Sequence, residues 1–126
     1  MTRADALRIA REWLAAGWRE RGPLYPDVLD APRGPVRRED REPVILEDQV
    51  VEESFGWVLP YQTRLFVRTG DSRDGLAGNW PLVVDRRGNL YVAAPASADE
   101  RDWRDPLRPF RSGAFPAPVK RRGETE

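Results

Sequence analysis

A chain of 126 residues is long enough for one domain and too short for two domains that each bury a core. Its 21 basic and 21 acidic residues balance to zero net charge, which argues against a global electrostatic footprint for nucleic acid. The sequence has no histidine and no cysteine, which excludes disulfides, thiol nucleophiles and any catalytic triad that needs a histidine.

The distribution of charge predicts a cytoplasmic protein. Residues 1–21 carry charges throughout, which argues against a secretory signal peptide. The longest uncharged runs are far shorter than the ~20 apolar residues that a membrane helix needs. We therefore expect a soluble protein without membrane contact.

The first predicted element is a helix over residues 2–20. Its apolar residues recur at three- and four-residue spacing, and Trp13 lies on this stripe. Thr2 and Asp5 have the spacing of a capping box, with aspartate in place of the usual glutamate or glutamine. Core packing is the favoured role for Trp13, while Trp18 stays undecided between the core and a contact surface.

Residues 22–43 change in character. Five prolines interrupt a run that is rich in arginine and acidic residues. Because proline blocks helices and discourages central strands, we predict a loop insertion, with room for a short edge strand near residues 25–29.

From residue 44 the apolar period changes toward two, which suggests an antiparallel hairpin. Residues 44–53 lead into a turn at 54–56, and residues 57–62 form the returning strand. Along that strand Trp57, Leu59 and Tyr61 share one face.

This face is predicted to be core, so Trp57 is interpreted as a packing residue in preference to an interface anchor. Pro60 lies in the same strand and has no N–H to donate. The strand is therefore expected to be an edge at Pro60 or to carry a bulge there.

A second hairpin has a clearer pattern. The apolar runs 82–84 and 90–92 flank a turn in which Gly88 can take the left-handed conformation. Before it, residues 64–68 extend the strand or form a connector, and residues 69–78 form a loop rich in glycine and aspartate.

The last part of the chain is again rich in proline. We expect a short helix around residues 98–104 and then a Pro-rich, poorly ordered tail at residues 105–126, whose basic end, residues 120–122, is interpreted as a solvated terminus. Residues 1–104 are then a single α+β domain, with the N-terminal helix packed on a small antiparallel sheet of about four strands.

Several short motifs together resemble a known family. They are Phe55-Gly56-Trp57, Tyr61-Gln62, Thr69-Gly70-Asp71, Leu76-Ala77-Gly78-Asn79 and Pro81-Leu82-Val83-Val84-Asp85. On these residues the chain resembles the YrhB-like family, also called immunity protein 35. The resemblance implies a small α+β protein, often encoded beside bacterial polymorphic toxins, that neutralises a cognate toxin by binding it. One family member is similar to a small heat-stable chaperone-like protein, so binding of unfolded clients is the implied alternative.

The densest run of carboxylates in the predicted strands is Glu47, Asp48, Glu52 and Glu53. Because side chains alternate along a strand, Glu47 and Glu53 are expected on one face, and Asp48 and Glu52 on the other. The run is interpreted either as a solvated hairpin end or as an acidic patch that docks a basic cleft, as inhibitors of nucleases do.

Three further candidate contacts are Asp71, Asp74 and Trp80, and for Trp80 burial and partner contact carry equal weight. Gly78 and Asn79 are interpreted as a turn pair whose amide side chain bonds local backbone, in preference to an amide offered to a partner. The structural motif is therefore Trp57, Tyr61, Gly78 and Asn79.

Enzyme signatures are weak. Residues 71–75 resemble a calcium loop superficially, because Leu82 occupies the position where a bidentate glutamate is needed. Residues 76–79 lack the lysine of a P-loop, and no carboxylate pair stands out for hydrolysis. We expect no catalytic residue, no metal site and no cofactor, and a protein partner in place of nucleic acid. The oligomeric state stays open.

Overall fold

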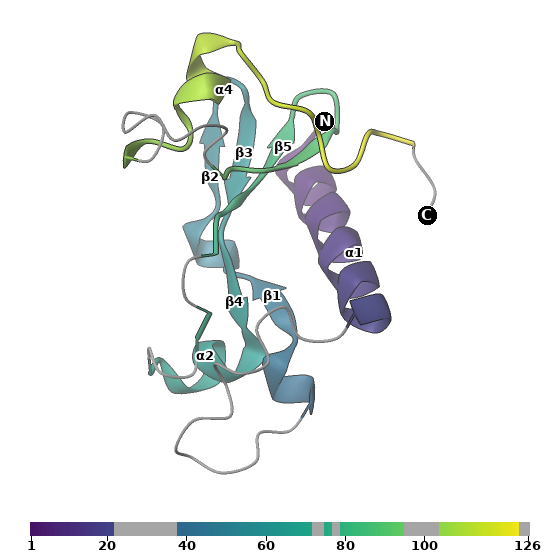
Figure 1. The fold of residues 1–126 in the computed structure, drawn as a ribbon, viewed down its shortest axis with the longest axis vertical. Helices are drawn as coiled ribbons and strands as arrows, with labels where there is room; N and C mark the ends of the chain where they lie inside the picture. The colour runs from purple at the N-terminus through teal and green to yellow at the C-terminus, as the bar shows by residue number, and fades with distance from the viewer. Residues whose placement is uncertain (22–37, 72–74, 77–78, 95–103, 124–126) are drawn as a thin grey trace.

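Figure 1 shows a computed structural model of the chain, and it describes residues 1–21, 38–71, 75–76, 79–94 and 104–123. Most of the predicted loop insertion, including the strand expected near residues 25–29, lies outside these residues. The helix expected around residues 98–104 lies outside them as well, apart from residue 104.

The described elements follow one another along the chain, with η marking 3-10 helices. They are α1 (Arg3–Arg21), η2 (Arg38–Arg41), β1 (Pro43–Ile45), η3 (Glu47–Gln49), β2 (Val51–Glu53), β3 (Gly56–Leu59), β4 (Tyr61–Thr63), α2 (Arg64–Thr69), β5 (Leu82–Asp85), β6 (Leu90–Val92) and α4 (Arg108–Ser112).

The strands form two antiparallel sheets. The larger sheet has the order β2-β3-β5-β6, and the smaller sheet pairs β1 with β4. Figure 1 shows α1 running beside the strands, and its buried side chains share one core cluster with them. The predicted α+β class, with an N-terminal helix on a four-stranded antiparallel sheet, is confirmed; the separate β1–β4 sheet is an addition.

The helix α1 begins with the predicted capping box. The backbone N–H of Thr2 donates to Oδ2 of Asp5 at 2.9 Å, and the N–H of Asp5 donates to Oγ1 of Thr2 at 3.2 Å. The first of these bonds, and then a hydrogen bond that the Thr2 hydroxyl donates to the same carboxylate oxygen at 3.0 Å, hold the pKa of Asp5 below its usual 3.8. Two N–H groups at the start of the helix are thereby satisfied.

The main core lies between α1 and the strands. Trp57 is 2% exposed, and Leu59 and Tyr61 are also buried, so the predicted core face is confirmed. Trp13 is half-buried and packs against this core, while Trp18 is buried. The cluster consists of Ala6, Leu7, Ala10, Leu14, Ile45, Trp57, Leu59, Tyr61, Leu82, Val84 and Leu90.

Pro60 divides the predicted first hairpin into two. β3 ends just before it and pairs with β2, whereas β4 begins just after it and pairs with β1. The carbonyl of Pro60 accepts a hydrogen bond from the N–H of Leu46 at 2.9 Å, which continues the β1–β4 pairing by one residue. The predicted strand over residues 57–62 is therefore two strands, and the structure has a break at Pro60 where an edge or a bulge was expected.

The β3–β5 pairing requires a glycine at position 56. Gly56 has a φ of 147°, and a Cβ built there would lie 2.1 Å from the carbonyl oxygen of Val84. No other residue type fits this close approach without shifting β5.

The second hairpin is found as predicted, with Gly88 at a φ of 89° between β5 and β6. The buried carboxylate of Asp85 organises the turn, because it accepts hydrogen bonds from the N–H groups of Arg87 and Asn89 at 2.9 Å. It also accepts the hydroxyl of Tyr91 at 2.8 Å. Burial first, and then this hydrogen bond, raise the pKa of Tyr91 to about 12.

The C-terminal residues cover the second face of the larger sheet. Phe110 in α4 is 2% exposed, and its ring centroid lies 5.6 Å from that of Phe55 and 5.3 Å from that of Tyr91. Further along, the N–H of Val119 donates to the carbonyl of Leu90 at 2.8 Å, beside β6.

Residues 105–123 therefore differ from the poorly ordered tail predicted for residues 105–126. Prolines exclude a long helix here, but Pro109 occupies the first turn of α4, where proline is well tolerated. The apolar side chains of the segment then pack on a sheet face that the sequence pattern had left without a cover.

Residues 64–68, expected as a strand extension or a connector, belong to the short helix α2. Thr63 caps its N-terminus, since Oγ1 of Thr63 accepts a hydrogen bond from the N–H of Phe66 at 3.1 Å, and Gly70 ends the helix in the left-handed conformation.

Among the described helices, none combines the length and the apolarity that a bilayer crossing requires.

Candidate docking surface

The carboxylates predicted to bind a partner lie on η3 and β2. Glu47 and Asp48 belong to η3, Glu52 and Glu53 belong to β2, and Val51 between them is 50% exposed. Among the described strands, β2 forms one edge of the larger sheet. We name these five residues the acidic edge.

The expected alternation of the four carboxylates along one strand is wrong. Residues 47–49 form a 3-10 turn, and extended backbone resumes at Val50. The neighbouring strand contains Pro60 at this point, and Pro60 has no N–H with which to continue the hydrogen-bond ladder. Glu47 and Asp48 therefore do not share a strand with Glu52 and Glu53.

Two of the four carboxylates are compensated within the molecule. Glu47 forms an ion pair with Arg11 of α1, and its backbone carbonyl accepts from Nη2 of Arg3 at 2.7 Å. Glu52 pairs with Nη1 of Arg86 at 2.7 Å. Because all these ions are substantially exposed, each pair contributes at most about 1 kcal/mol and can be exchanged for a partner's cation.

The carboxylates of Asp48 and Glu53 have no partner among the described residues. The uncompensated negative charge of the acidic edge is thus concentrated at these two positions. An exposed apolar side chain, Val51, lies between them in the sequence. Such a combination suits a basic surface with a small apolar contact at its centre.

The acidic edge is fixed to the core through Arg86 in the β5–β6 turn. Its guanidinium lies over the buried indole of Trp57, with Cζ 4.5 Å from the ring centroid. Its Nη2 also donates to the carbonyl of Glu53 at 2.5 Å. The edge strand is therefore held in position before any partner arrives.

The other predicted contacts lie elsewhere. Asp71 follows α2, which Figure 1 places at the end of the molecule opposite α4, and its side chain is half-buried. Trp80 is half-buried as well, and this degree of burial fits both predicted roles, packing in the core and contact with a partner. Asp74 lies outside the described residues. Asp71 and the β2 carboxylates do not form one cluster.

Asn79 has a structural role that differs from the predicted one. Its Nδ2 donates to the carbonyl of Tyr61 in β4 at 2.9 Å, which lies 18 positions away, and not to local backbone. Because this edge carbonyl is satisfied by a side chain, Asn79 anchors the segment before β5 to the smaller sheet. Gly78 lies outside the described residues.

The sequence interpretation missed a basic group that the fold assembles. Arg86 and Arg87 in the β5–β6 turn lie beside Lys120, Arg121 and Arg122, because Leu90 and Lys120 form an antiparallel bridge. The backbone N–H of Arg122 also donates to Oδ1 of Asn89 at 2.9 Å. The two basic runs were visible in the sequence, but their proximity depends on the long-range pairing of the C-terminal segment.

Within the described part of the chain, no three or more acidic side chains are grouped in a way that could hold a metal ion. The chemistry that the acidic edge supports is recognition by charge and shape.

Comparison with known proteins identifies a family. A family model described as Immunity protein 35 matches residues 4–106 of the chain. It confirms the resemblance to immunity protein 35, while the YrhB-like designation stays a prediction. No curated protein and no solved structure matches the chain.

Proposed function

Because the chain belongs to the immunity protein 35 family, we propose that it protects a bacterial producer by binding a cognate toxin in the cytoplasm and neutralising it by occlusion. The family match is the observation that carries this proposal. Binding is stoichiometric and not catalytic in this proposal, consistent with a sequence that has neither histidine nor cysteine.

We place the docking site at the acidic edge. The carboxylates of Asp48 and Glu53 are available to a basic surface, and those of Glu47 and Glu52 can exchange their arginine partners for cations of the toxin. Arg86 and the β2–β3 pairing hold this edge rigid, which lowers the entropy lost on binding. A stable interface of this kind buries about 800 Å² on each partner.

The alternative, a chaperone-like protein, would need a broad apolar surface for unfolded clients. The exposed large apolar side chains of the described residues are divided among the N-terminus, β2, α2 and the C-terminal segment: Met1, Val51, Val67, Phe115 and Val119. This distribution favours one specific partner over many clients.

The docking site is tested by calorimetric titration of the toxin-domain protein encoded beside this gene, used in an inactivated form. Wild type should bind it with one-to-one stoichiometry, and the double variant Asp48→Lys/Glu53→Lys should bind about tenfold more weakly or worse. The matched control Glu20→Lys/Glu39→Lys reverses two exposed acids away from the edge and should leave affinity unchanged. Equal losses in the two double variants would show that net charge, and not this edge, governs binding.

A further inference from the structure

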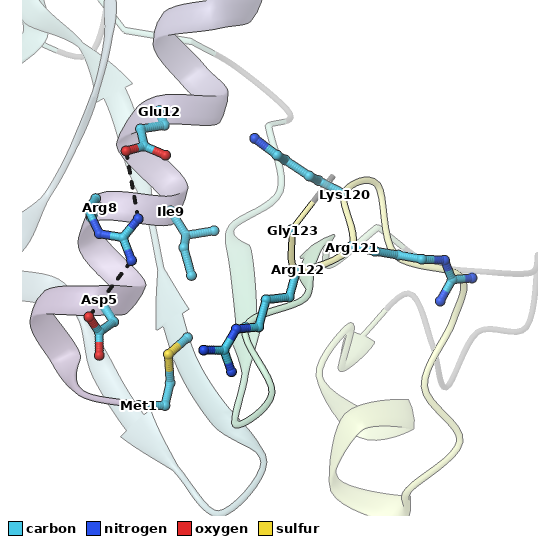
Figure 2. A pocket seen from close by; sticks show the side chains of 10 residues that line it. Met1, Asp5, Arg8, Ile9, Glu12, Lys120, Arg121, Arg122 and Gly123 are labelled. Carbon is cyan, nitrogen blue, oxygen red and sulfur yellow. Dashed lines mark ion pairs between the residues drawn. The ribbon is translucent and has the colours of Figure 1, made fainter. Parts of the chain in front are cut away.

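A cleft of about 430 Å³ separates the first half of α1 from the C-terminal segment. One wall carries Asp5, Arg8 and Glu12, and the other carries Lys120 and Arg122 (Figure 2). Figure 2 shows the Ile9 side chain directed into the space between the two walls, whereas Arg121 points away from α1. The cleft therefore combines charged walls with an apolar contact.

The α1 wall is largely compensated within itself. Arg8 lies 3.8 Å from Asp5 and 3.7 Å from Glu12, so it pairs with both acids (Figure 2). These pairs are exposed and weak, and the side chains of Asp5, Arg8 and Glu12 together carry a net charge of −1.

The opposite wall is not compensated. Neither the ammonium of Lys120 nor the guanidinium of Arg122 has a partner among the described residues. Their backbone is nevertheless fixed, because the carbonyl of Lys120 accepts from Leu90 at 2.8 Å and the N–H of Arg122 donates to Asn89 at 2.9 Å. Two cations are thus held at the rim of the cleft with their charge available.

We propose that this cleft receives an acidic segment of the partner protein, in which carboxylate side chains contact Lys120 and Arg122 and a neighbouring apolar side chain contacts Ile9. The inference rests on the proposed function and adds a second contact of opposite charge to the acidic edge. A nucleic acid fits less well, because its continuous phosphate charge would meet Asp5 and Glu12 on the facing wall. The zero net charge of the chain favours the same choice.

The two walls differ in their relation to the family. The α1 wall lies within the matched residues 4–106, and Lys120 and Arg122 lie beyond them. A contact made by residues outside the matched region is suited to distinguishing one toxin from another, because specificity is a difference between affinities.

The probe is a short capped peptide in which two glutamates flank a leucine, followed by amide chemical shifts of the full chain. We expect saturable shifts at Ile9, Gly88 and Gly123. The double variant Lys120→Glu/Arg122→Glu should weaken the affinity about tenfold, because two attractions become repulsions. The single variants Lys120→Glu and Arg122→Glu should each weaken it by a smaller factor, and Arg19→Glu, an equal change of charge at the far end of α1, is their matched control and should have no effect.

Several outcomes would overturn the proposal: no saturable shift at these amides, unchanged affinity in the double variant, equal binding of a lysine-for-glutamate peptide, or tighter binding of a short DNA duplex. Unchanged shifts elsewhere in the variants confirm that they fold. The assay needs no toxin, so its failure is separable from failure of the immunity function. If the wild-type chain protects cells but the peptide does not bind, the cleft proposal fails and the proposed function stands.

Discussion

The guanidinium of Arg86 lies over the indole of Trp57, 4.5 Å from the ring centroid, and connects that core residue to the acidic edge. The same side chain bonds the carboxylate of Glu52 at 2.7 Å and the carbonyl of Glu53 at 2.5 Å. One arginine thus joins the β5–β6 turn, the core and the edge strand, so the position of the proposed docking site depends on the core beneath it.

Replacing Arg86 by alanine should lower the free energy of unfolding by about 2 kcal/mol, through loss of the cation–π contact and an exposed ion pair. Arg87→Ala is the matched control, because Arg87 is an exposed neighbour with no side-chain partner among the described residues. Urea denaturation followed by tryptophan fluorescence measures both. Equal effects of the two variants would contradict the role of Arg86.

Tyr91 should make stability fall at high pH. The pKa of Tyr91 is raised from 10.0 to about 12, so its contribution is fully present below the unfolded pKa of 10.0 and is lost as pH rises toward about 12. The loss is on the order of 2 kcal/mol. Tyr91→Phe should remove this part of the slope in denaturation curves taken across that range, whereas an unchanged slope would show that other groups cause it.

Phe110 should be essential for packing the C-terminal segment on the second face of the larger sheet. Phe110→Ala should cost about 3 to 5 kcal/mol, as expected for a buried phenylalanine. Phe115→Ala, at a residue that is 37% exposed, should cost much less. If both variants are as stable as wild type in denaturant, residues 105–123 do not pack on the sheet.

The capping box should make α1 sensitive to acid. Because the pKa of Asp5 is lowered below 3.8, its contribution is present above that value and is lost as pH falls through the folded pKa. Asp5→Asn should therefore lower the thermal midpoint at neutral pH and lose this difference in strong acid. Glu12→Gln on the same helix is the control, and an equal effect at both positions would argue against a specific cap.

The sequence patterns predicted those elements whose information is local. The periodicity and cap of α1, the core face of Trp57, Leu59 and Tyr61, and the turn at Gly88 all follow from residues close in the chain. The missing N–H of Pro60 indicated only an edge or a bulge, and the division into β3 and β4 was not predicted.

Long-range relationships were not predictable in the same way. Nothing near Asn79 in the sequence indicates a bond to Tyr61, and nothing near Lys120 indicates a bridge to Leu90. The spacing of Leu107 and Phe110 is that of a short helix, but the surrounding prolines conceal it. The acidic edge was identified by its charge, while its split between η3 and β2 required the knowledge that pairing stops at Pro60.

The most direct test of the immunity function is growth of cells that express the neighbouring toxin. Co-expression of the chain at equal levels should restore growth, and the Asp48→Lys/Glu53→Lys variant at the same level should protect less. Failure of the wild-type chain to restore growth, or equal protection against unrelated toxins, would contradict the account.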